Sequence, residues 1–189
     1  MSKNTHSYTA EDITKLDGIE AVQTRPGMYI GSIDEDGLHH LLLEVVSNSI
    51  DEYLNGYGTE VKINISKDGR TASILDDGRG IPFGLTKDGS EAMIEICTSL
   101  HSGGKFGQGG YSVSGGLHGI GLTAVNALSN HFKIVSSRDD KVATLTSVRG
   151  RDVKFGVEDK RNVPKGTFVE FTPNSEVFGK HTFALNKIT

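Results

Sequence analysis

The segment from His40 to Asn48 holds three side chains that could act together on a bound ligand. Glu44 is a carboxylate able to accept a proton, His40 lies one helical turn before it and Asn48 one turn after it. Side chains at this spacing share one face of a helix. The set predicts a site where a base, an imidazole and an amide meet one ligand, although an ordinary solvated face has the same pattern. Because adjacent His39 and His40 point to different faces and no Cys or further His has ligand spacing, the pattern disfavours a metal held by histidines.

A second candidate is the turn 76–82, DDGRGIP, which directly follows an apolar segment. A carboxylate at the end of a strand can accept a hydrogen bond from an exocyclic amine. The glycines that follow let backbone lie against a flat ring. The sequence therefore predicts recognition of a nucleotide base by Asp76, with a plain loop turn as the alternative.

A third candidate is the stretch 103–121, GGKFGQGGYSVSGGLHGIG, in which nine of nineteen residues are glycine. Glycine lets backbone N–H groups turn toward an anion, and a helix beginning at about 117 to 122 would aim its free N–H groups there. We expect a phosphate cradle and lid, with a loop that binds nothing as the alternative. A Walker A loop is excluded because Phe106 follows Lys105, and a Rossmann site is disfavoured because no strand leads directly into Gly119.

The helix that must present Glu44 is expected from Gly37 to Gly56. At 100° per residue its apolar residues fill one wide arc and its polar residues the rest. The apolar arc comprises Leu38, Leu41, Leu42, Val45, Val46, Ile50, Tyr53 and Leu54. The polar arc comprises His40, Glu44, Ser47, Asn48, Asp51 and Glu52.

The remaining elements predict an α+β fold. Alternating residues and turn signals indicate a hairpin of 61–65 with 71–75, then helices over 91–99 and from about 117–122 through LTAVNALS. Strands are expected at 132–136, 142–148, 154–156 and 167–172. Because the strands cluster, we predict a two-layer α/β sandwich whose mixed, mostly antiparallel sheet carries helices on one face.

Composition limits the class of protein. The chain has 189 residues, a net charge of −4 and one cysteine, Cys97, which we interpret as a small buried hydrophobe in a reducing cytoplasm. No signal peptide or membrane-spanning run is visible, and the charge disfavours electrostatic binding of nucleic acid by this segment. Residues 1–15 are expected to form an arm and residues 16–189 one domain, and TFALNKIT resembles the opening of a helix, so we expect a fragment.

Several of these segments together resemble the GHKL (Bergerat-fold) ATPases, and within them the N-terminal ATPase domains of the B subunits of DNA gyrase and topoisomerase IV. RPGMYIG, GLHHLLLEVV, NSIDE, DDGRGIP, GGKF, VSGGLHG, NAL and GTFVEF stand in that family's order. The resemblance covers Tyr8 to about Pro173. It implies the two-layer fold, ATP and Mg²⁺ as ligands, and ATP-driven dimer closure that powers DNA strand passage.

The resemblance also implies roles for single residues. Glu44 would be the general base for the attacking water, His40 would orient or polarise that water, and Asn48 would hold magnesium. Asp76 would accept from the adenine amino group, supported through an ordered water by Thr167. Glu52 and Arg79 would pair at the pocket mouth. The base would also meet Gly80, Ile81, Pro82, Ile74, Ile96 and Val169.

The phosphates would be wrapped by the glycine stretch, through Gly103, Gly104, Lys105, Tyr111, Leu117, His118, Gly119, Ile120 and Gly121. Arg138 falls where the family contacts aminocoumarin inhibitors. Tyr8 and Ile13 match arm residues that cross to a second subunit, with Tyr8 reaching its nucleotide.

The resemblance implies further partners outside this chain, a gyrase A-type cleavage subunit and duplex DNA. It also implies weak or absent turnover here, because the family's γ-phosphate lysine lies in a following transducer domain. Ser47 departs from the usual Asp, and GQGG is richer in glycine than usual. The alternative is a dimerisation module of a chaperone-like or mismatch-repair-like relative that hydrolyses little ATP.

Overall fold

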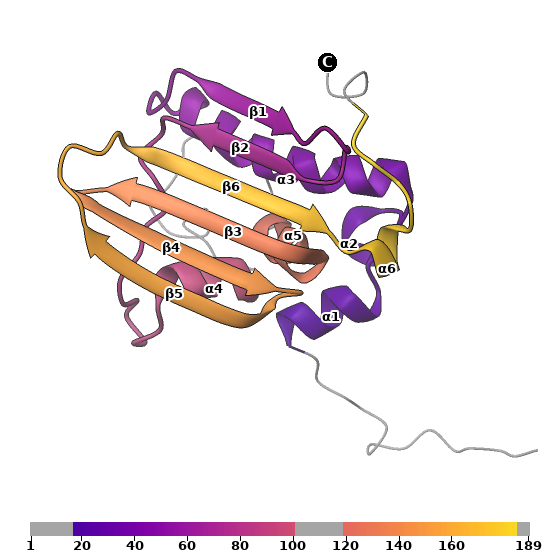
Figure 1. Cartoon of the computed structure of the whole chain (residues 1–189). Coiled ribbons are helices and arrows are strands. Elements are labelled where there is room, and N and C mark those ends of the chain that lie inside the picture. The colour runs from indigo at the N-terminus through magenta and orange to yellow at the C-terminus, as the bar shows by residue number, and fades with distance from the viewer. Residues whose placement is uncertain (1–16, 101–118, 185–189) are drawn as a thin grey trace, which may run out of the picture.

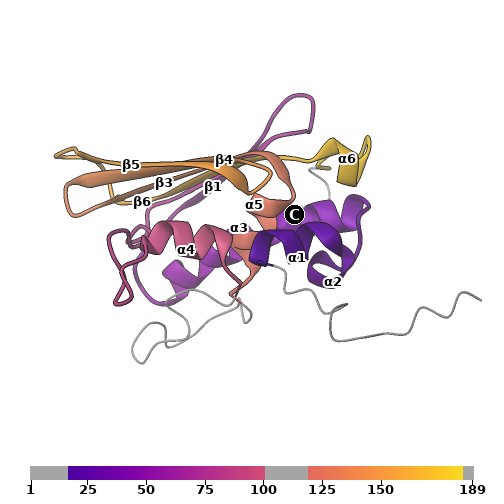
Figure 2. The same cartoon turned by 90° about the horizontal axis from the view of Figure 1, so that it is seen from below.

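The computed structural model describes residues 17–100 and 119–184 of the chain. Six strands form one sheet in the order β1-β2-β6-β3-β4-β5, and each neighbouring pair is antiparallel. Helices α1, α3, α4 and α5 lie on one face of this sheet (Figures 1 and 2). The predicted two-layer α+β fold is confirmed, with every described pairing antiparallel.

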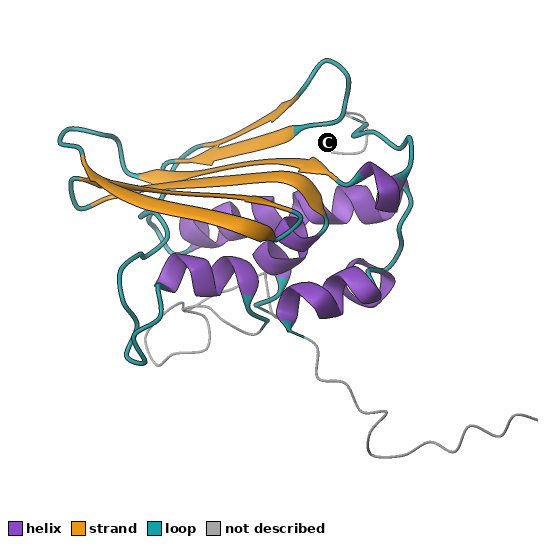
Figure 3. Cartoon of the chain, turned by 60° about the horizontal axis from the view of Figure 1, so that its bottom comes forward, coloured by secondary structure: helices purple, strands orange, loops and turns teal. Residues whose placement is uncertain are grey.

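The strands are β1 (Val61–Ile65), β2 (Ala72–Asp76), β3 (Ser129–Arg138), β4 (Lys141–Val148), β5 (Arg151–Asp159) and β6 (Gly166–Pro173). The helices are α1 (Gly18–Thr24), α2 (Gly27–Ile30), α3 (Glu35–Leu54), α4 (Ala92–Thr98), α5 (Gly121–Ala127) and α6 (Ser175–Phe178). Figure 3 shows the helical and strand layers in separate colours.

The late strand β6 lies between β2 and β3, so two distant parts of the chain meet at the centre of the sheet. Ile74 on β2 pairs with Val169 on β6, which pairs in turn with Ile134 on β3. All three side chains are buried and face the helices as part of the core. The same register places the first residues of β6 beside the end of β2. The turn 76–82, called the acidic turn below, begins at this point.

Helix α3 begins where a polar cap satisfies its free N–H groups. The Asp34 carboxylate accepts from the N–H groups of Asp36 and Gly37, and two acidic residues occupy the first turn. Both features stabilise a helix N-terminus. The helix therefore starts two residues before the predicted Gly37 and ends at Leu54.

The predicted apolar arc of α3 is right for its first half and wrong for its last two turns. Leu38, Leu41, Leu42 and Val45 are buried. Farther along, the apolar residues are exposed, with Ile50 at 43%, Tyr53 at 59% and Leu54 at 52%, while the polar residues Ser49, Asp51 and Glu52 are buried. The reason is that this end of α3 faces the polar turn after β2, which supplies hydrogen-bond partners.

Helix α5 is buried along its whole length and joins the other helices to the sheet. Asn126 donates through Nδ2 to the carbonyl oxygen of Cys97 at 2.8 Å and accepts from the hydroxyl of Ser147. The hydroxyl of Thr123 donates to the carbonyl oxygen of Ser99 at 2.9 Å. These bonds fix α5 to the end of α4 and to β4.

The last described residues lie along the first half of α3. The N–H of Ala184 donates to Nε2 of His39 at 3.0 Å, and Nδ1 of His39 lies 2.7 Å from the carbonyl oxygen of Glu35. Phe183 packs edge-on against the same imidazole. Residues 182–184 are not helical, so the expected helix at TFALNKIT is wrong for its described part.

Three short helices, α1, α2 and α6, were not predicted, whereas β1 has the predicted bounds. Strand β5 is longer than the expected 154–156. The prediction was too short because most residues of this edge strand are exposed and show no apolar alternation. Among residues 17–100 and 119–184, no helix has the length and hydropathy needed to cross a bilayer.

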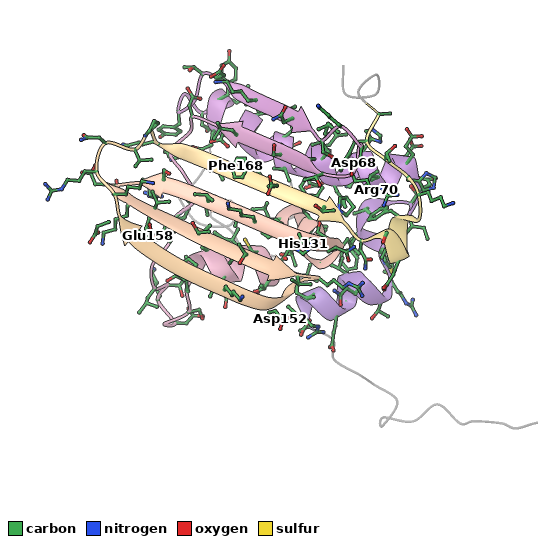
Figure 4. The ribbon with its side chains drawn as sticks, viewed as in Figure 1. Asp68, Arg70, His131, Asp152, Glu158 and Phe168 are labelled. Carbon is green, nitrogen blue, oxygen red and sulfur yellow. The ribbon has the colours of Figure 1, made fainter. Side chains whose placement is uncertain are left out.

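The face of the sheet opposite the main helices is turned toward the viewer in Figure 4. His131 on β3 and Phe168 on β6 project from it, and Glu158 lies at the β5 edge. Burial alternates along β2 and β4, as the period of two residues in a strand requires, whereas the edge strands β1 and β5 are mostly exposed.

Candidate functional site

Asp76, the last residue of β2, lies at the centre of a buried hydrogen-bond cluster. Its Oδ1 accepts from the backbone N–H groups of Gly78 and Thr167, each at 3.0 Å, and its Oδ2 accepts from the Ser49 hydroxyl at 2.8 Å. Burial raises the pKa of Asp76 above its usual value, against the opposing effect of these three hydrogen bonds. The carboxylate is thus shielded from solvent and held in place by three donors.

The neighbouring aspartate, Asp77, has the opposite environment. It is exposed, and its carboxylate accepts from the hydroxyl of Thr59 at 2.5 Å and from the N–H groups of Thr59 and Glu60. These bonds, the hydroxyl first, lower the pKa of Asp77 to about 2. Asp77 therefore closes the turn against β1, and Asp76 is the carboxylate that faces the interior.

Glu52 and Arg79 pair as predicted. Arg79 donates through Nε to Oε2 of Glu52 at 3.0 Å and through Nη2 to Oε1 at 2.8 Å, and its backbone N–H also donates to Oε2 at 3.0 Å. The guanidinium carbon lies 3.6 Å from the centroid of the Tyr57 ring, a cation–π distance. The bidentate pair fixes the acidic turn to the end of α3.

His40 and Glu44 are also in contact. Nε2 of His40 lies 3.2 Å from Oε1 of Glu44, and the side chains are 43% and 30% exposed, so both are accessible to a ligand. The first residue of α5 packs against the other carboxylate oxygen, since a Cβ on Gly121 would fall 2.3 Å from Oε2 of Glu44. Asn48 lies one turn farther along α3 and is partly buried.

Some of the apolar residues predicted for the base pocket belong to the core next to Asp76. Ile74 and Val169 are paired neighbours on β2 and β6, at 1% and 3% exposure, and Ile96 on α4 packs against the same core. Ile81 is partly buried and its carbonyl oxygen accepts from the Ser136 hydroxyl at 2.7 Å, whereas Pro82 is exposed. The structure therefore brings together an acceptor and an apolar surface.

Gly80 and Arg138 lie on the β3 side of the turn. Gly80 has φ of +79°, and a Cβ there would fall 2.8 Å from the Ser136 hydroxyl, so a glycine is required. Nη1 of Arg138 donates to the carbonyl oxygen of Gly80 at 3.4 Å, while Nε pairs with Asp139. Arg138 therefore borders the predicted base pocket.

A pocket of about 150 Å³ lies on the β1 side of Asp76. Its lining residues include Ser49, Ile50, Tyr53, Thr59, Asp76 and Gly78. None of Ile74, Ile96 or Val169 belongs to that lining, so this pocket is not the one predicted for the base.

Several predicted residues lie outside the described part of the chain. Gly119, Ile120 and Gly121 are described and lead into α5, with Gly119 at φ of +58°. The predictions for Tyr8, Ile13, Gly103, Gly104, Lys105, Tyr111, Leu117 and His118 concern residues outside the described ranges.

Sequence reasoning missed Ser49 as a site residue, because its partner Asp76 lies 27 residues away and no local pattern links them. The backbone N–H of Thr167 also bonds directly to Asp76, a contact that sequence reasoning did not include. For magnesium, the described residues contain no group of three or more His, Cys, Asp or Glu side chains able to hold a metal. Asn48 could still supply one oxygen ligand to an ion held mainly by phosphates and water.

Comparison with known proteins shows which family the chain resembles. Residues 33–176 match the histidine kinase-, DNA gyrase B- and HSP90-like ATPase family. The chain is 48% identical over 178 residues to the B subunits of DNA topoisomerase 4 from Staphylococcus aureus strains MW2 and N315. That alignment covers 94% of this chain and 27% of the relative, so the chain spans about a quarter of its length.

A solved structure is also similar. The 43K ATPase domain of Thermus thermophilus gyrase B, crystallised with an aminocoumarin, superposes with a TM-score of 0.77 at 36% identity. The match covers 92% of this chain and 43% of that one.

Proposed function

Because the chain belongs to the histidine kinase-, DNA gyrase B- and HSP90-like ATPase family, we propose that it is the ATP-binding and ATP-hydrolysing domain of a type IIA DNA topoisomerase, from the B-type chain of that enzyme. The observation that carries the proposal is the buried carboxylate of Asp76, held by Ser49, Gly78 and Thr167. An ionised carboxylate only accepts hydrogen bonds, and the adenine amino group can donate one.

The adenine ring would lie between the acidic turn and the apolar residues behind it. Gly80, Ile81 and Pro82 pass beside the base, and Ile74, Val169 and Ile96 supply the apolar surface. Arg79, fixed by Glu52, closes the mouth of the pocket. Arg138, which bonds to Gly80, is the residue proposed to contact aminocoumarins.

Glu44 is the proposed general base. Hydrolysis of ATP requires a water placed in line with the leaving oxygen and a group that orients it. The Glu44 carboxylate is partly exposed and contacts His40, which would orient or polarise the same water. Asn48, on the same helix face, would supply an oxygen to Mg²⁺, which when bound neutralises charge on the phosphates. Residues 103–121 would wrap those phosphates.

The whole protein's activity follows from the same proposal. ATP binding would close a dimer of this domain, with Tyr8 and Ile13 of the arm reaching the second copy. Duplex DNA and a gyrase A-type subunit would bind through other segments, since the net charge here is −4. Such a protein works in the cytoplasm. The chain by itself would hydrolyse little ATP, because the family's lysine comes from the following domain.

The alternative is a nucleotide-dependent dimerisation module of another branch of the family. The presence of Glu44 disfavours this alternative, because a module that only binds ATP does not need a general base beside the phosphates. Steady-state hydrolysis by a chain extended to the length of the relatives distinguishes the two. Hydrolysis that is abolished by Glu44→Gln supports the topoisomerase reading, and no hydrolysis supports the alternative.

Calorimetric titration of a non-hydrolysable ATP analogue with Mg²⁺ tests the proposed site. We expect the parent chain to bind the analogue and the Asp76→Asn variant to lose binding, because an amide N–H would face the adenine amino group. Binding of equal affinity by both proteins, or by neither, would contradict the proposal.

A further inference from the structure

Ser49, on α3, supplies the third hydrogen bond to the Asp76 carboxylate. Its hydroxyl donates to Oδ2 at 2.8 Å, while Oδ1 takes both backbone donors, from Gly78 and Thr167. Ser49 and Asp76 are only 4% and 6% exposed, so water is a poor substitute for these bonds. A carboxylate offers roughly four acceptor positions, which leaves one on Oδ2 for a ligand.

The ionisation of Asp76 decides what that last position can bind. An ionised Oδ2 accepts from an amino group, whereas a protonated Oδ2 presents an O–H that suits a carbonyl oxygen. Burial disfavours the charged form, and the Ser49 hydrogen bond is the largest effect that favours it. Other charges do not replace Ser49. Glu52 is of like sign and is paired with Arg79, and the Asp77 carboxylate is turned to Thr59.

We propose that Ser49 is a specificity-determining residue whose hydroxyl keeps Oδ2 of Asp76 an acceptor and so selects 6-amino over 6-oxo purine nucleotides. The inference rests on the proposed function, because it takes Asp76 as the residue that meets the base. Ser49 acts through Asp76 and need not touch the nucleotide. It also ties recognition of the base to α3, the helix that carries Glu44 and Asn48.

The test compares non-hydrolysable analogues of ATP and inosine triphosphate, whose purines present an amino group and a carbonyl at position 6. Dissociation constants are measured by calorimetry with Mg²⁺ between pH 5.5 and 8.5 for the parent and for Ser49→Ala. We expect the parent to prefer the adenine analogue. In Ser49→Ala that preference falls roughly tenfold at the acidic end, because a hydrogen bond to a charged group is lost, and returns as pH rises.

Ser129→Ala is the matched control. The Ser129 side chain is fully buried, and its hydroxyl donates to the carbonyl oxygen of Val125 at 2.6 Å, remote in sequence from the acidic turn. We expect its preference for the adenine analogue, and the pH at which that preference is half lost, to equal those of the parent.

Two results overturn the inference. One is a Ser49→Ala variant that binds both analogues more weakly by the same factor, with no change in the pH dependence of binding. A purely structural role of Ser49 would give that result. The other is an unchanged preference at every pH. If the parent binds neither analogue, the proposed function itself is wrong, so the two failures are distinguishable.

Discussion

Oε2 of Glu44 lies against Cα of Gly121, so closely that a Cβ on residue 121 would fall 2.3 Å from it. Real Cβ atoms do not approach an oxygen to that distance, so one partner would have to move. Gly121 is also the first residue of α5. Gly121, the last residue of the glycine-rich segment 103–121, is therefore needed to make room for the Glu44 carboxylate, whether or not the segment binds phosphate.

Gly121→Ala is expected to displace the Glu44 carboxylate while leaving the adenine contacts in place. We predict a loss of hydrolysis of roughly 100-fold, since small misplacement of a catalytic group has that effect. Hydrolysis is measured in a chain extended to the length of the relatives, and nucleotide affinity by calorimetry. Gly27→Ala is the control, because a Cβ there meets nothing within 4 Å. Equal rates in the two variants would disprove the prediction.

Asp76→Asn is expected to stabilise the free protein while it abolishes binding of the ATP analogue. Burial raises the pKa of Asp76 in the folded state, so the folded state binds this proton more tightly than the unfolded state does, and ionisation of Asp76 at neutral pH lowers stability. Asparagine can accept the two backbone N–H bonds through its oxygen and donate to Ser49 through its nitrogen. The melting temperature at pH 7.5 should rise, and its excess over the parent should shrink as pH falls.

Asp77→Asn is expected to have the opposite effect on stability. The pKa of Asp77 is lowered to about 2, so its charged form stabilises the folded state above the usual aspartate pKa, and this contribution is lost as pH falls toward 2. The variant should melt below the parent at pH 7.5 and approach it in acid. A melting temperature above that of the parent at neutral pH would refute the assignment.

Removal of Arg79 should destabilise the protein more than removal of the whole ion pair. Glu52 is 10% exposed and Arg79 is 37% exposed, so Arg79→Ala leaves a largely buried carboxylate without its cation. We expect a loss of about 2 kcal/mol in the free energy of unfolding, between the values for buried and exposed pairs. The Glu52→Gln/Arg79→Ala double variant should recover part of it in urea denaturation. No recovery would argue against a charge effect.

Cys97 should be inert to thiol reagents in the folded protein. Its side chain is fully buried, and burial raises the pKa of the thiol to about 12. The thiolate is the reactive form, so alkylation is expected only as the protein unfolds. Labelling followed across a urea gradient should therefore track loss of structure. Rapid labelling in native buffer would contradict the buried position.

The sequence was informative where signals are local. Alternation set the bounds of β1, and spacing placed His40, Glu44 and Asn48 on one helix face. Helix α1 was missed although a local signal exists, since Asp17 caps it by accepting from the N–H of Glu20.

Signals that depend on distant segments could not be read. The bond of Thr167 to Asp76 joins residues 91 positions apart through the insertion of β6 beside β2. The inverted burial of α3 after Val45 has the same origin, because hydrophobic periodicity assumes an apolar partner and this end of the helix meets a polar turn. The turn at residues 76–82 predicted Asp76 and the family resemblance implied Thr167, but neither indicated Ser49.

That inverted half of α3 also bears on the order in which the chain folds. Ser49, Asp51 and Glu52 are buried in the native protein, and Asp76 and Arg79 supply partners to Ser49 and Glu52 only after β2 and the turn behind it are in place. Docking these last turns earlier would bury charge without compensation. The first half of α3 can collapse onto apolar neighbours alone. In the folding transition state, residues 38–45 of the helix should accordingly have near-native contacts, whereas residues 49–54 should form theirs only after the transition state.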